Sequence, residues 1–335
     1  MERVTIKDIA REAGVSVAAV SHALNGNGQT KEATRKRILE TAERMHYVPN
    51  TSAKMLQAGR TKNIGFLVSS MSGPYFLKLI ETMQKTCERY GYNMITVYSE
   101  NPKVIMQHLF GKGIDGAVIY YGQDRIREKQ IERIELMQVP TIFLDREIKR
   151  QSIGSVVYAS YESGVEVTEH LLSLGHKQIF FLAGSEDAYD AQERLRGYKE
   201  TMEKHGFAVK DSMIFEGRFE EHITRKNVSA YLEQGGSLPD AIIAANDTSA
   251  VGCVKALTEH GYRVPEDVSV VSFDDVELAQ YFRPALTTVH NPIEMQGERA
   301  VEMLMKMMVF GDKKEGEICK LKGNLIIRDS CMKKA

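Results

Sequence analysis

The chain has 335 residues, of which 43% are hydrophobic, and a formal net charge of −1. This length suits two or three domains with real cores, and the near-zero total charge by itself gives no sign of a nucleic-acid partner. The N-terminus is polar and no apolar run approaches about 18 residues, so the sequence predicts neither a signal peptide nor a membrane span. Four scattered cysteines without CxxC spacing favour a reduced, cytoplasmic protein.

The first predicted elements are two short helices around a tight turn, within residues 4–26. Gly14 stands at the turn, where a residue without Cβ accepts a positive φ, and Ser16 is the predicted N-cap of the second helix. Two helices joined in this way can place the second one in a DNA major groove. The expected apolar faces comprise Ile6, Ile9, Ala10 and Ala13, then Ala19, Val20 and Leu24.

A third helix is expected next, with Thr30 as its N-cap, which makes residues 1–46 an all-helical domain. Its predicted apolar face comprises Ile38, Leu39, Ala42 and Met45. Residues 1–60 carry ten Lys and Arg against six Asp and Glu, a formal charge of +4, whereas the rest of the chain sums to −5. A basic head on an acidic body suits phosphate contact at one end of the protein.

Residues 47–61 are predicted to form a linker that contains a short helix. Pro49 should end the third helix because it lacks a backbone donor, and Asn50 or Thr51 could cap a new segment that ends at Gly59. A helix this short is marginal alone in water, so we expect it to form best against a partner.

From residue 62 onward, apolar runs of strand length alternate with helical patterns, which is typical of parallel, doubly wound sheets with helices on both faces. The predicted body covers residues 62–335, with subdomains at about 62–150, where 276–290 crosses, and at about 156–275 with 291–335. The expected strands are 64–69, 93–98, 117–121, 141–144, 179–183, 241–244 and 268–273, and the expected helices are 75–90, 161–174, 192–205, 222–233 and 248–260.

Head, linker and body together resemble the LacI/GalR family of bacterial repressors over nearly the whole chain. The motifs are common singly, but their order and spacing are specific. They include Thr5-Ile-x-Asp-Ile-Ala, Val20-Ser-x-x-Leu-Asn-Gly26, Tyr47-x-Pro-Asn50, His170-Leu-Leu-x-Leu-Gly-His176, Arg194-Leu-x-Gly-Tyr198, Asn246-Asp247, Phe273-Asp-Asp275 and Pro284-Ala-Leu-Thr-Thr-Val289. The resemblance implies an N-terminal all-α helix-turn-helix head and an α/β body of two doubly wound parallel-sheet subdomains, similar to a periplasmic binding protein.

The resemblance implies that the second helix enters the major groove of a near-palindromic operator, bound by a homodimer. Val17, Ala18 and His22 correspond to the base-reading positions; the first two can contact a thymine methyl, and His22 can donate to a guanine. Val17 could instead be a packed or tolerated apolar residue. The candidate phosphate contacts are Ser16, Ser21, Asn25, Thr30 and Thr34.

In the linker, Leu56 matches the hinge leucine that the family wedges into the minor groove, with Asn50 and Ala53 in register. An apolar wedge unstacks a base step and kinks the duplex. The two hinge helices of a dimer would form together on DNA. The alternative is that Leu56 packs against the body.

The resemblance also implies an effector pocket between the two subdomains. The first subdomain is expected to contribute Tyr75, Phe76, Asp145 and Arg146, and the second Arg194, Phe219, Asn246, Asp247 and Asp274. Phe219 could stack on a sugar face while Arg194 and the carboxylates hydrogen-bond hydroxyls. Both phenylalanines could instead be core residues, and Asp274 could simply cap a strand end without binding the effector.

A sugar or glycoside is the expected effector, because Asp145-Arg146 resembles sugar-responsive members, whereas purine-binding members carry an aromatic residue at Arg146. The segment 99–112 is short for the family, which predicts a truncated helix, and Ser160-Tyr161 replaces a common Asp-Asn pair. These departures, with a tyrosine-rich rim, suggest a bulkier ligand such as an oligosaccharide. The rim is expected from Tyr120, Tyr121 and Tyr189. The alternatives are a non-sugar metabolite and a protein co-repressor.

No enzyme chemistry is predicted. The GxGxxG pattern of residues 111–116 precedes a strand, whereas a dinucleotide fingerprint must follow one. Asp274 and Asp275 are adjacent on a strand end and should point apart. The nine histidines show no metal spacing, so neither a metal nor a cofactor is expected. Family members that form tetramers carry a C-terminal leucine-repeat tail, whereas this chain stops five residues after Ser330, so the resemblance implies a dimer.

Overall fold

The computed structural model describes residues 4–25, 30–47, 60–71, 73–122, 125–144, 146–310 and 316–334, without the side chains of Asn25 and Phe310. Its contacts divide the chain into two units, Met1–Arg60 and Thr61–Ala335. The division falls at the end of the predicted linker. Within the described residues, no helix combines the length and apolar character that crossing a membrane requires.

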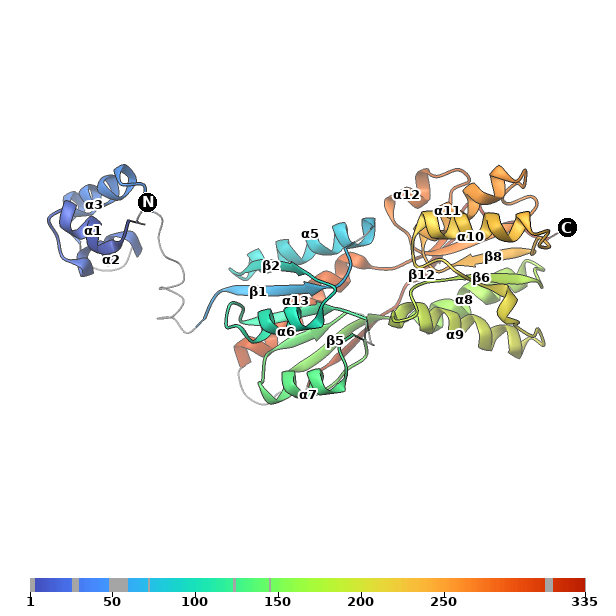
Figure 1. Cartoon of the computed structure of the whole chain (residues 1–335), viewed down its shortest axis with the longest axis horizontal. Helices are drawn as coiled ribbons and strands as arrows, with labels where there is room; N and C mark the ends of the chain where they lie inside the picture. Colours follow the sequence, from blue (N-terminus) through green and yellow to red (C-terminus); the bar gives the residue numbers. More distant parts are fainter. Residues whose placement is uncertain are drawn as a thin grey trace. The chain divides into compact units, whose positions relative to one another are not determined.

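The head consists of three helices, drawn in blue in Figure 1: α1 (Ile6–Glu12), α2 (Val17–Asn25) and α3 (Glu32–Arg44). Gly14 adopts a φ of 62° at the turn, as predicted. Ser16 Oγ accepts a hydrogen bond of 3.2 Å from the amide of Ala19, which confirms its N-capping role. The core of the head comprises Ile9, Ala10, Ala13, Val20, Ala23, Ile38 and Ala42.

Two details of the third helix differ from the prediction. The N-cap position of α3 is Lys31, which makes no side-chain capping bond, so Thr30 is not the cap. Leu39 is 42% exposed. The buried stripe runs through Ile38 and Ala42, which are four residues apart on one face, and Leu39 is turned by about 100° from Ile38.

The body contains two six-stranded sheets, and the first has the order β11-β5-β4-β3-β1-β2, with every pair parallel. Helices cover both of its faces, as the alternating pattern predicted. Its strands are β1 (Asn63–Val68), β2 (Asn93–Tyr98), β3 (Gly116–Tyr120), β4 (Thr141–Phe143), β5 (Ile153–Tyr158) and β11 (Ile318–Leu321). Its helices are α5 (Pro74–Arg89), α6 (Pro102–Phe110), α7 (Glu128–Leu136) and α13 (Ile293–Phe310). The nine-residue α6 fills the segment expected to hold a short helix.

The second sheet has the order β12-β10-β9-β8-β6-β7 and is parallel except for β12. Two core clusters lie on its two faces. Its strands are β6 (Ile179–Ala183), β7 (Ile214–Glu216), β8 (Ala241–Ala244), β9 (Ser269–Asp274), β10 (Thr287–His290) and β12 (Asn324–Ile326). Its helices are α8 (Ser160–Ser173), α9 (Tyr189–Lys204), α10 (Glu221–Glu233), α11 (Asp247–Glu259) and α12 (Glu277–Tyr281), with a 3₁₀ turn at Asp211–Met213.

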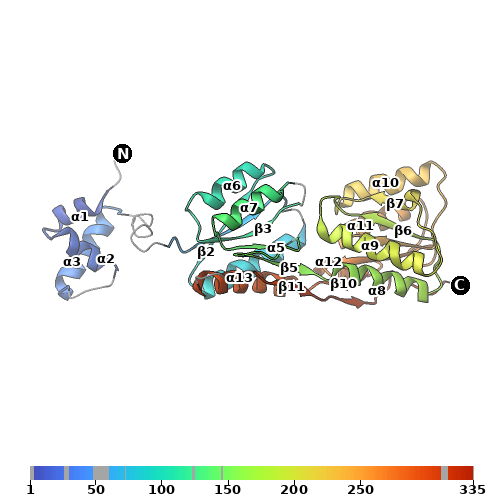
Figure 2. The same cartoon turned by 90° about the horizontal axis from the view of Figure 1, so that it is seen from below.

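The predicted division between subdomains was wrong at its C-terminal end. Strand β10, within the predicted 276–290 crossing, belongs to the second sheet, whereas α13 and β11 belong to the first. The cause is hydrophobic: Ala300, Leu304 and Met308 of α13 are buried in the core cluster of the first sheet. Figure 2 shows α13 and β11 alongside β5.

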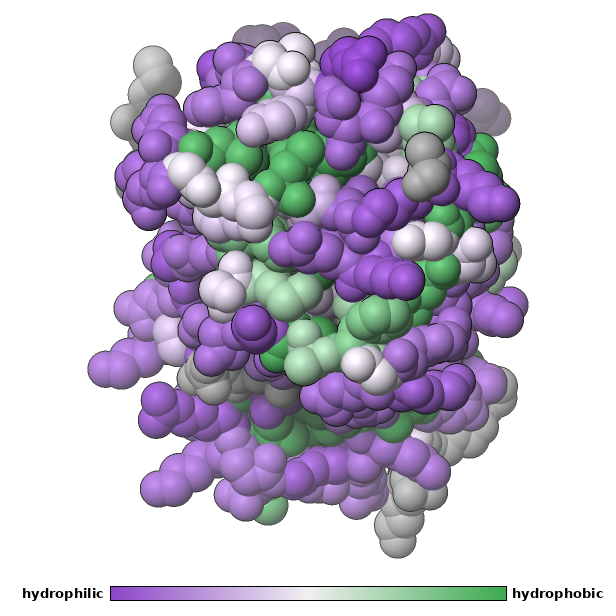
Figure 3. Space-filling model, turned by 90° about the vertical axis from the view of Figure 1, so that its right-hand side faces the viewer, coloured by the Kyte–Doolittle hydropathy of each residue, from purple (hydrophilic) through white to green (hydrophobic). Residues whose placement is uncertain are grey.

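The chain therefore crosses between the subdomains near residues 159, 291 and 322. Multiple crossings join two separately cored units without merging their cores. The end of the body seen in Figure 3 is largely hydrophilic, with hydrophobic side chains visible between the polar ones. The crossings place the carboxyl ends of the strands of the two sheets on either side of a shared space.

Candidate functional site

A cavity of about 400 Å³ lies between the two subdomains of the body. Its walls come from the segments that follow the carboxyl ends of parallel strands in both sheets, the usual place for a ligand in open α/β folds. The described lining includes Ser69, Ser70, Tyr75, Phe76, Tyr120, Tyr158, Ser185, Asp187, Asp190, Arg194, Arg218, Phe219, Glu220, Glu221, His222, Asn246, Asp247 and Asp274.

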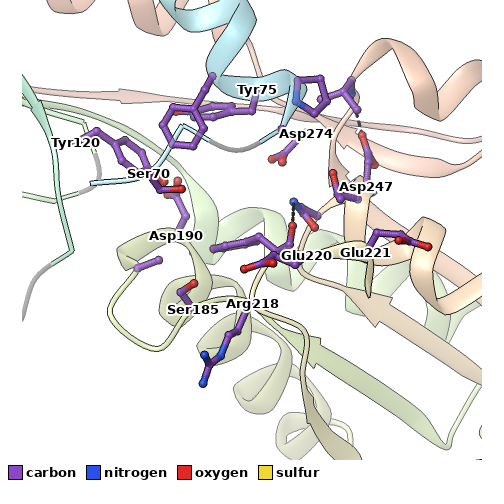
Figure 4. A pocket seen from close by; sticks show the side chains of 18 of the residues that line it. Ser70, Tyr75, Tyr120, Ser185, Asp190, Arg218, Glu220, Glu221, Asp247 and Asp274 are labelled. Atoms are coloured by element: carbon purple, nitrogen blue, oxygen red, sulfur yellow. Dashed lines mark hydrogen bonds between the residues drawn. The ribbon is translucent and has the colours of Figure 1, made fainter. Parts of the chain in front are cut away.

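Aromatic rings from the first subdomain form one wall. Phe76 meets Tyr75 and Tyr120 edge to face, with ring centroids 5.1 and 5.0 Å apart. Tyr75 donates a hydrogen bond of 2.6 Å to Gln296 Oε1, which ties α5 to α13. Figure 4 shows Tyr75 and Tyr120 in the upper part of the view, above Glu220 and Glu221. This wall offers an apolar surface to a ring-shaped ligand.

Phe219 lies on the opposite side, in the loop between β7 and α10, with a φ of 63°. A Cβ at Gly184 would lie 2.2 Å from its ring, so only glycine there leaves room for the phenyl group. Asn246 caps α11 by accepting 2.9 Å from the Ser249 amide, and its Nδ2 donates to the Phe219 carbonyl at 3.3 Å. The α11 cap therefore also holds the Phe219 loop in place.

Arg194 is a buried cation at the base of the cavity, with 3% of the residue exposed. It donates to the Ala245 carbonyl and, at 3.2 Å, to Asp274 Oδ1, and its guanidinium lies 4.7 Å from the Phe273 ring centroid. Burial alone would lower the pKa of Arg194, but Asp274 and Asp190 outweigh burial and raise it. Arg194 therefore stays charged within a fixed network.

Asp247 has a structural role that the sequence did not reveal. Its Oδ1 accepts from Ser272 at 2.5 Å and Thr288 at 2.7 Å, and its Oδ2 accepts from the Val276 amide at 2.8 Å. Burial, and secondarily the neighbouring Asp274 carboxylate, raises the pKa of Asp247 to about 7. Asp247 thus anchors the start of α11 to β9 and β10, and this framework role does not depend on a ligand.

The structure brings seven of the nine predicted effector residues to this cavity: Tyr75, Phe76, Arg194, Phe219, Asn246, Asp247 and Asp274. Asp145 lies outside the described residues. Arg146 is not in the lining; it borders a different cavity and donates to the Ile126 carbonyl. The hydrogen bond to Ile126 holds the Arg146 side chain at that second cavity, so the prediction that Arg146 lines the first one was wrong.

The predicted tyrosine rim is also only partly present. Tyr120 lines the cavity, but Tyr121 is 1% exposed and donates to the Ser99 carbonyl at 2.8 Å. Tyr189 borders the cavity of Arg146 and donates to Glu147 Oε1 at 2.5 Å. Successive residues on a strand point to opposite faces, which is why Tyr120 and Tyr121 separate.

Two lining residues that the sequence reading missed are Asp190 and Tyr158. Asp190 precedes Arg194 by four residues on α9, so helical spacing alone could have placed both on one face. Tyr158 ends the apolar strand β5, and a polar group at the carboxyl end of a buried parallel strand is a ligand-site signal. Asp274 and Asp275 do point apart: Asp275 pairs with Arg328 at 2.6 Å.

In the head, the exposed side of α2 carries Val17, Ala18 and His22, and Val17 is 44% exposed. Ser16 is exposed as well as capping the helix, and the remaining described phosphate candidates are half-buried: Ser21, Thr30 and Thr34. The Asn25 side chain and Asn50, Ala53 and Leu56 lie outside the described residues. Within the described part of the chain, no three His, Cys, Asp or Glu side chains gather as metal ligands would.

Two segments of the chain match models of known protein families. Residues 5–50 match the model of bacterial regulatory proteins of the lacI family, and residues 168–331 match a periplasmic binding protein-like domain. The chain is 30% identical over 333 residues to the HTH-type transcriptional repressor PurR of Mannheimia succiniciproducens, covering 98% of this chain and 99% of that one. It is 32% identical over 308 residues to PurR of Vibrio atlanticus, covering 90% and 91%.

Solved structures give the same likeness in three dimensions. The lac repressor dimer bound to operator and the anti-inducer ONPF superimposes with a TM-score of 0.84 at 26% identity, covering 99% of this chain and 100% of that one. The Escherichia coli transcriptional repressor ascG superimposes with a TM-score of 0.68 at 30% identity, covering 81% and 99%. The helical head and the two-sheet body thus occur together in similar regulators.

Proposed function

The chain belongs to the lacI family of bacterial regulatory proteins, whose members are DNA-binding transcriptional repressors and not enzymes. We propose that it represses transcription as a dimer on a near-palindromic operator and that a small ligand controls this binding. The proposal rests on one observation: the same chain has a helix-turn-helix head and a cavity of about 400 Å³. The cavity is lined by buried polar side chains and lies at the carboxyl ends of the strands of two sheets. The head recognises DNA and the cavity a small molecule.

The DNA contacts would start from α2. Val17 and Ala18 would contact thymine methyl groups and His22 a guanine edge, while Ser16 and the other polar candidates hold phosphates. The lac repressor structure with a TM-score of 0.84 contains a dimer on its operator, which supports the same assembly here. A dimer reads two mirrored half-sites, so the operator would be near-palindromic.

The linker would connect the two activities. Asn50, Ala53 and Leu56 would form the hinge helix, with Leu56 wedged into the minor groove at the operator centre. An effector that favours one relative arrangement of the subdomains would favour or oppose this helix. By linkage, DNA would change effector affinity by the same factor, typically 1–3 kcal/mol (about 5–150-fold).

The effector is proposed to be a small polar metabolite, without restriction to sugars. The expectation of a sugar rested partly on Arg146, which does not line the cavity. The comparisons include repressors named PurR as well as the lac repressor with ONPF, and so do not single out a sugar. What the cavity offers is an aromatic wall and buried carboxylates, suited to an apolar ring with hydrogen-bond donors on it.

The experiment is an operator titration by fluorescence anisotropy, with the operator selected from a random pool and metabolites added singly. A compound that changes the operator Kd tenfold or more, about 1.4 kcal/mol, supports ligand control and gives its sign. Tight operator binding that no compound or cavity variant changes would reject ligand control and favour a protein co-repressor. Failure to select any operator would reject DNA recognition itself.

A further inference from the structure

Carboxylates outnumber basic groups among the described residues that line the cavity. The carboxylates are Asp187, Asp190, Glu220, Glu221, Asp247 and Asp274, and the basic groups are Arg194, Arg218 and His222. A ligand entering this space therefore meets a negative field, unless the three basic side chains are turned toward it.

None of those three basic groups is available deep in the cavity. Arg194 is engaged by Asp274 and the Ala245 carbonyl. Arg218 pairs with Glu216, outside the lining, and its side chain is 57% exposed; in Figure 4 its guanidinium points away from Asp190 and Asp274. His222 is 73% exposed beside Glu220. An anionic ligand would thus find no buried cation free to pair with it among the described lining residues.

The carboxylates nearest the buried Arg194 guanidinium are those of Asp190 and Asp274. They flank the single guanidinium of Arg194, and the side chain of Asp274 is only 12% exposed. Among the described residues, Asp274 accepts hydrogen bonds from Arg194 and, at 3.0 Å, from Asn291, and both reach Oδ1. Its Oδ2 therefore has no hydrogen-bond partner among the described residues. Two carboxylates therefore share one cation at the base of the cavity, and burial raises the pKa of Asp190, an effect that a bound cation would oppose.

A second, independent feature points to a ligand at the same place. Tyr158 is 1% exposed and lines the cavity, yet its hydroxyl has no hydrogen-bond partner among the described residues. Burial raises its pKa well above the ordinary value, and Tyr75, Asp190 and Asp274 act in the same direction, so the hydroxyl stays protonated. A buried hydroxyl without a partner is unfavourable, and a bound polar group would relieve it.

We propose that the effector is a ring compound bearing a protonated amino group, which Asp190 and Asp274 bind and whose neighbouring polar atom pairs with the Tyr158 hydroxyl. This inference rests on the proposed ligand control of the repressor and names the chemical class of its ligand. The aromatic wall of Tyr75, Phe76 and Tyr120 covers the ring. Phosphorylated and carboxylated metabolites are disfavoured because they add charge of the sign already in excess.

The test is isothermal titration calorimetry of the full-length protein with matched triplets: glucosamine, glucose and glucose 6-phosphate, and the same three forms of galactose and mannose. Cyclohexylamine and cyclohexanol extend the comparison beyond sugars. At least one amine is expected to bind ten times more tightly than its hydroxyl parent, and the phosphates not at all. A phosphate or parent that binds as tightly as its amine, or an absence of binding by every amine, would overturn the inference.

Variants locate the effect. Asp190→Asn and, separately, Asp274→Asn should each reduce the ratio of amine affinity to parent affinity tenfold or more. Glu193→Gln is the matched control, because it removes a carboxylate from the same helix outside the cavity lining. Thermal melting of each variant shows whether it is folded. If Asp190→Asn is not folded, the amine preference of Asp274→Asn tests the inference instead. An unchanged preference in both folded variants contradicts the inference.

Operator binding measured in parallel separates this inference from the proposed function. If an amine binds but leaves the operator Kd unchanged, the ligand class stands and ligand control fails. If a neutral or anionic compound binds and shifts the operator Kd, ligand control stands and the ligand class fails.

Discussion

Thr288 Oγ1 donates a hydrogen bond of 2.7 Å to Asp247 Oδ1. This bond joins strand β10, which precedes a crossing between the subdomains, to the first residue of α11. The same carboxylate holds Ser272 and the Val276 amide, so one buried group links β9, β10 and α11. A residue expected to bind the effector is therefore first a part of the framework around the cavity.

Asp247 should make stability depend on pH. Because the folded-state pKa is about 7 against an ordinary 3.8, the folded protein binds this proton more tightly than the unfolded chain does. Its contribution is fully present below about pH 4 and is lost as pH rises toward 7. Relative to Asp247→Asn, the wild type should lose roughly 2–4 kcal/mol of unfolding free energy over that range. Urea denaturation at pH 4.5, 5.5, 6.5 and 7.5 measures it; parallel curves for both proteins would contradict the assignment.

The close packing of α8 against α9 predicts a second effect. A Cβ at Gly164 would lie 2.5 Å from the Arg194 carbonyl oxygen, a backbone atom that cannot move without moving α9. Gly164→Ala should cost about 1–3 kcal/mol of stability and weaken ligand binding, because it displaces the helix that carries Asp190 and Arg194. Gly113→Ala, where nothing lies within 4 Å, is the control. Thermal melts and calorimetry test both effects, and equal behaviour of the two variants would refute the packing argument.

Gly122 and Asp187 meet where the two subdomains approach each other. A Cβ at Gly122 would lie 2.0 Å from Asp187 Oδ2, the end of a side chain that can rotate, so Gly122→Ala should displace the Asp187 side chain. We expect a loss of about 1 kcal/mol of stability, less than for the backbone clash at Gly164. Adding Asp187→Ala removes the clashing atoms and should recover most of the loss in a double-mutant cycle. Simple additivity of the two changes would show that the contact does not limit their approach.

Two roles of Ser16 can be separated by substitution. Ser16→Ala removes the α2 cap and should destabilise the head by about 1 kcal/mol, with weaker operator binding. Ser16→Asp keeps a capping oxygen but places a negative charge near DNA phosphates. It should restore the stability of the head while binding the operator more weakly than Ser16→Ala does. Circular dichroism melts and anisotropy titrations distinguish the two; equal operator affinities would leave capping as the sole role of Ser16.

The sequence alone was sufficient where local rules decide the outcome. The Gly14 turn and the Ser16 cap depend on neighbouring residues only, and the alternation of strands and helices follows from periodicity. The family resemblance carried by the motifs around Arg194, Asn246 and Asp274 implied one shared cavity, and all three residues line it.

Tertiary structure decided which apolar segment packs with which sheet and which polar atoms meet. The apolar stripe of α13 fits either subdomain in principle, and only its burial against the first sheet assigns it. Arg146 follows Asp145 in sequence but borders another cavity, and Asp190 acquires its importance from Asp274, 84 positions away, through Arg194. Periodicity reports which face of an element is buried, whereas charge balance in a cavity depends on distances between segments that no local pattern contains.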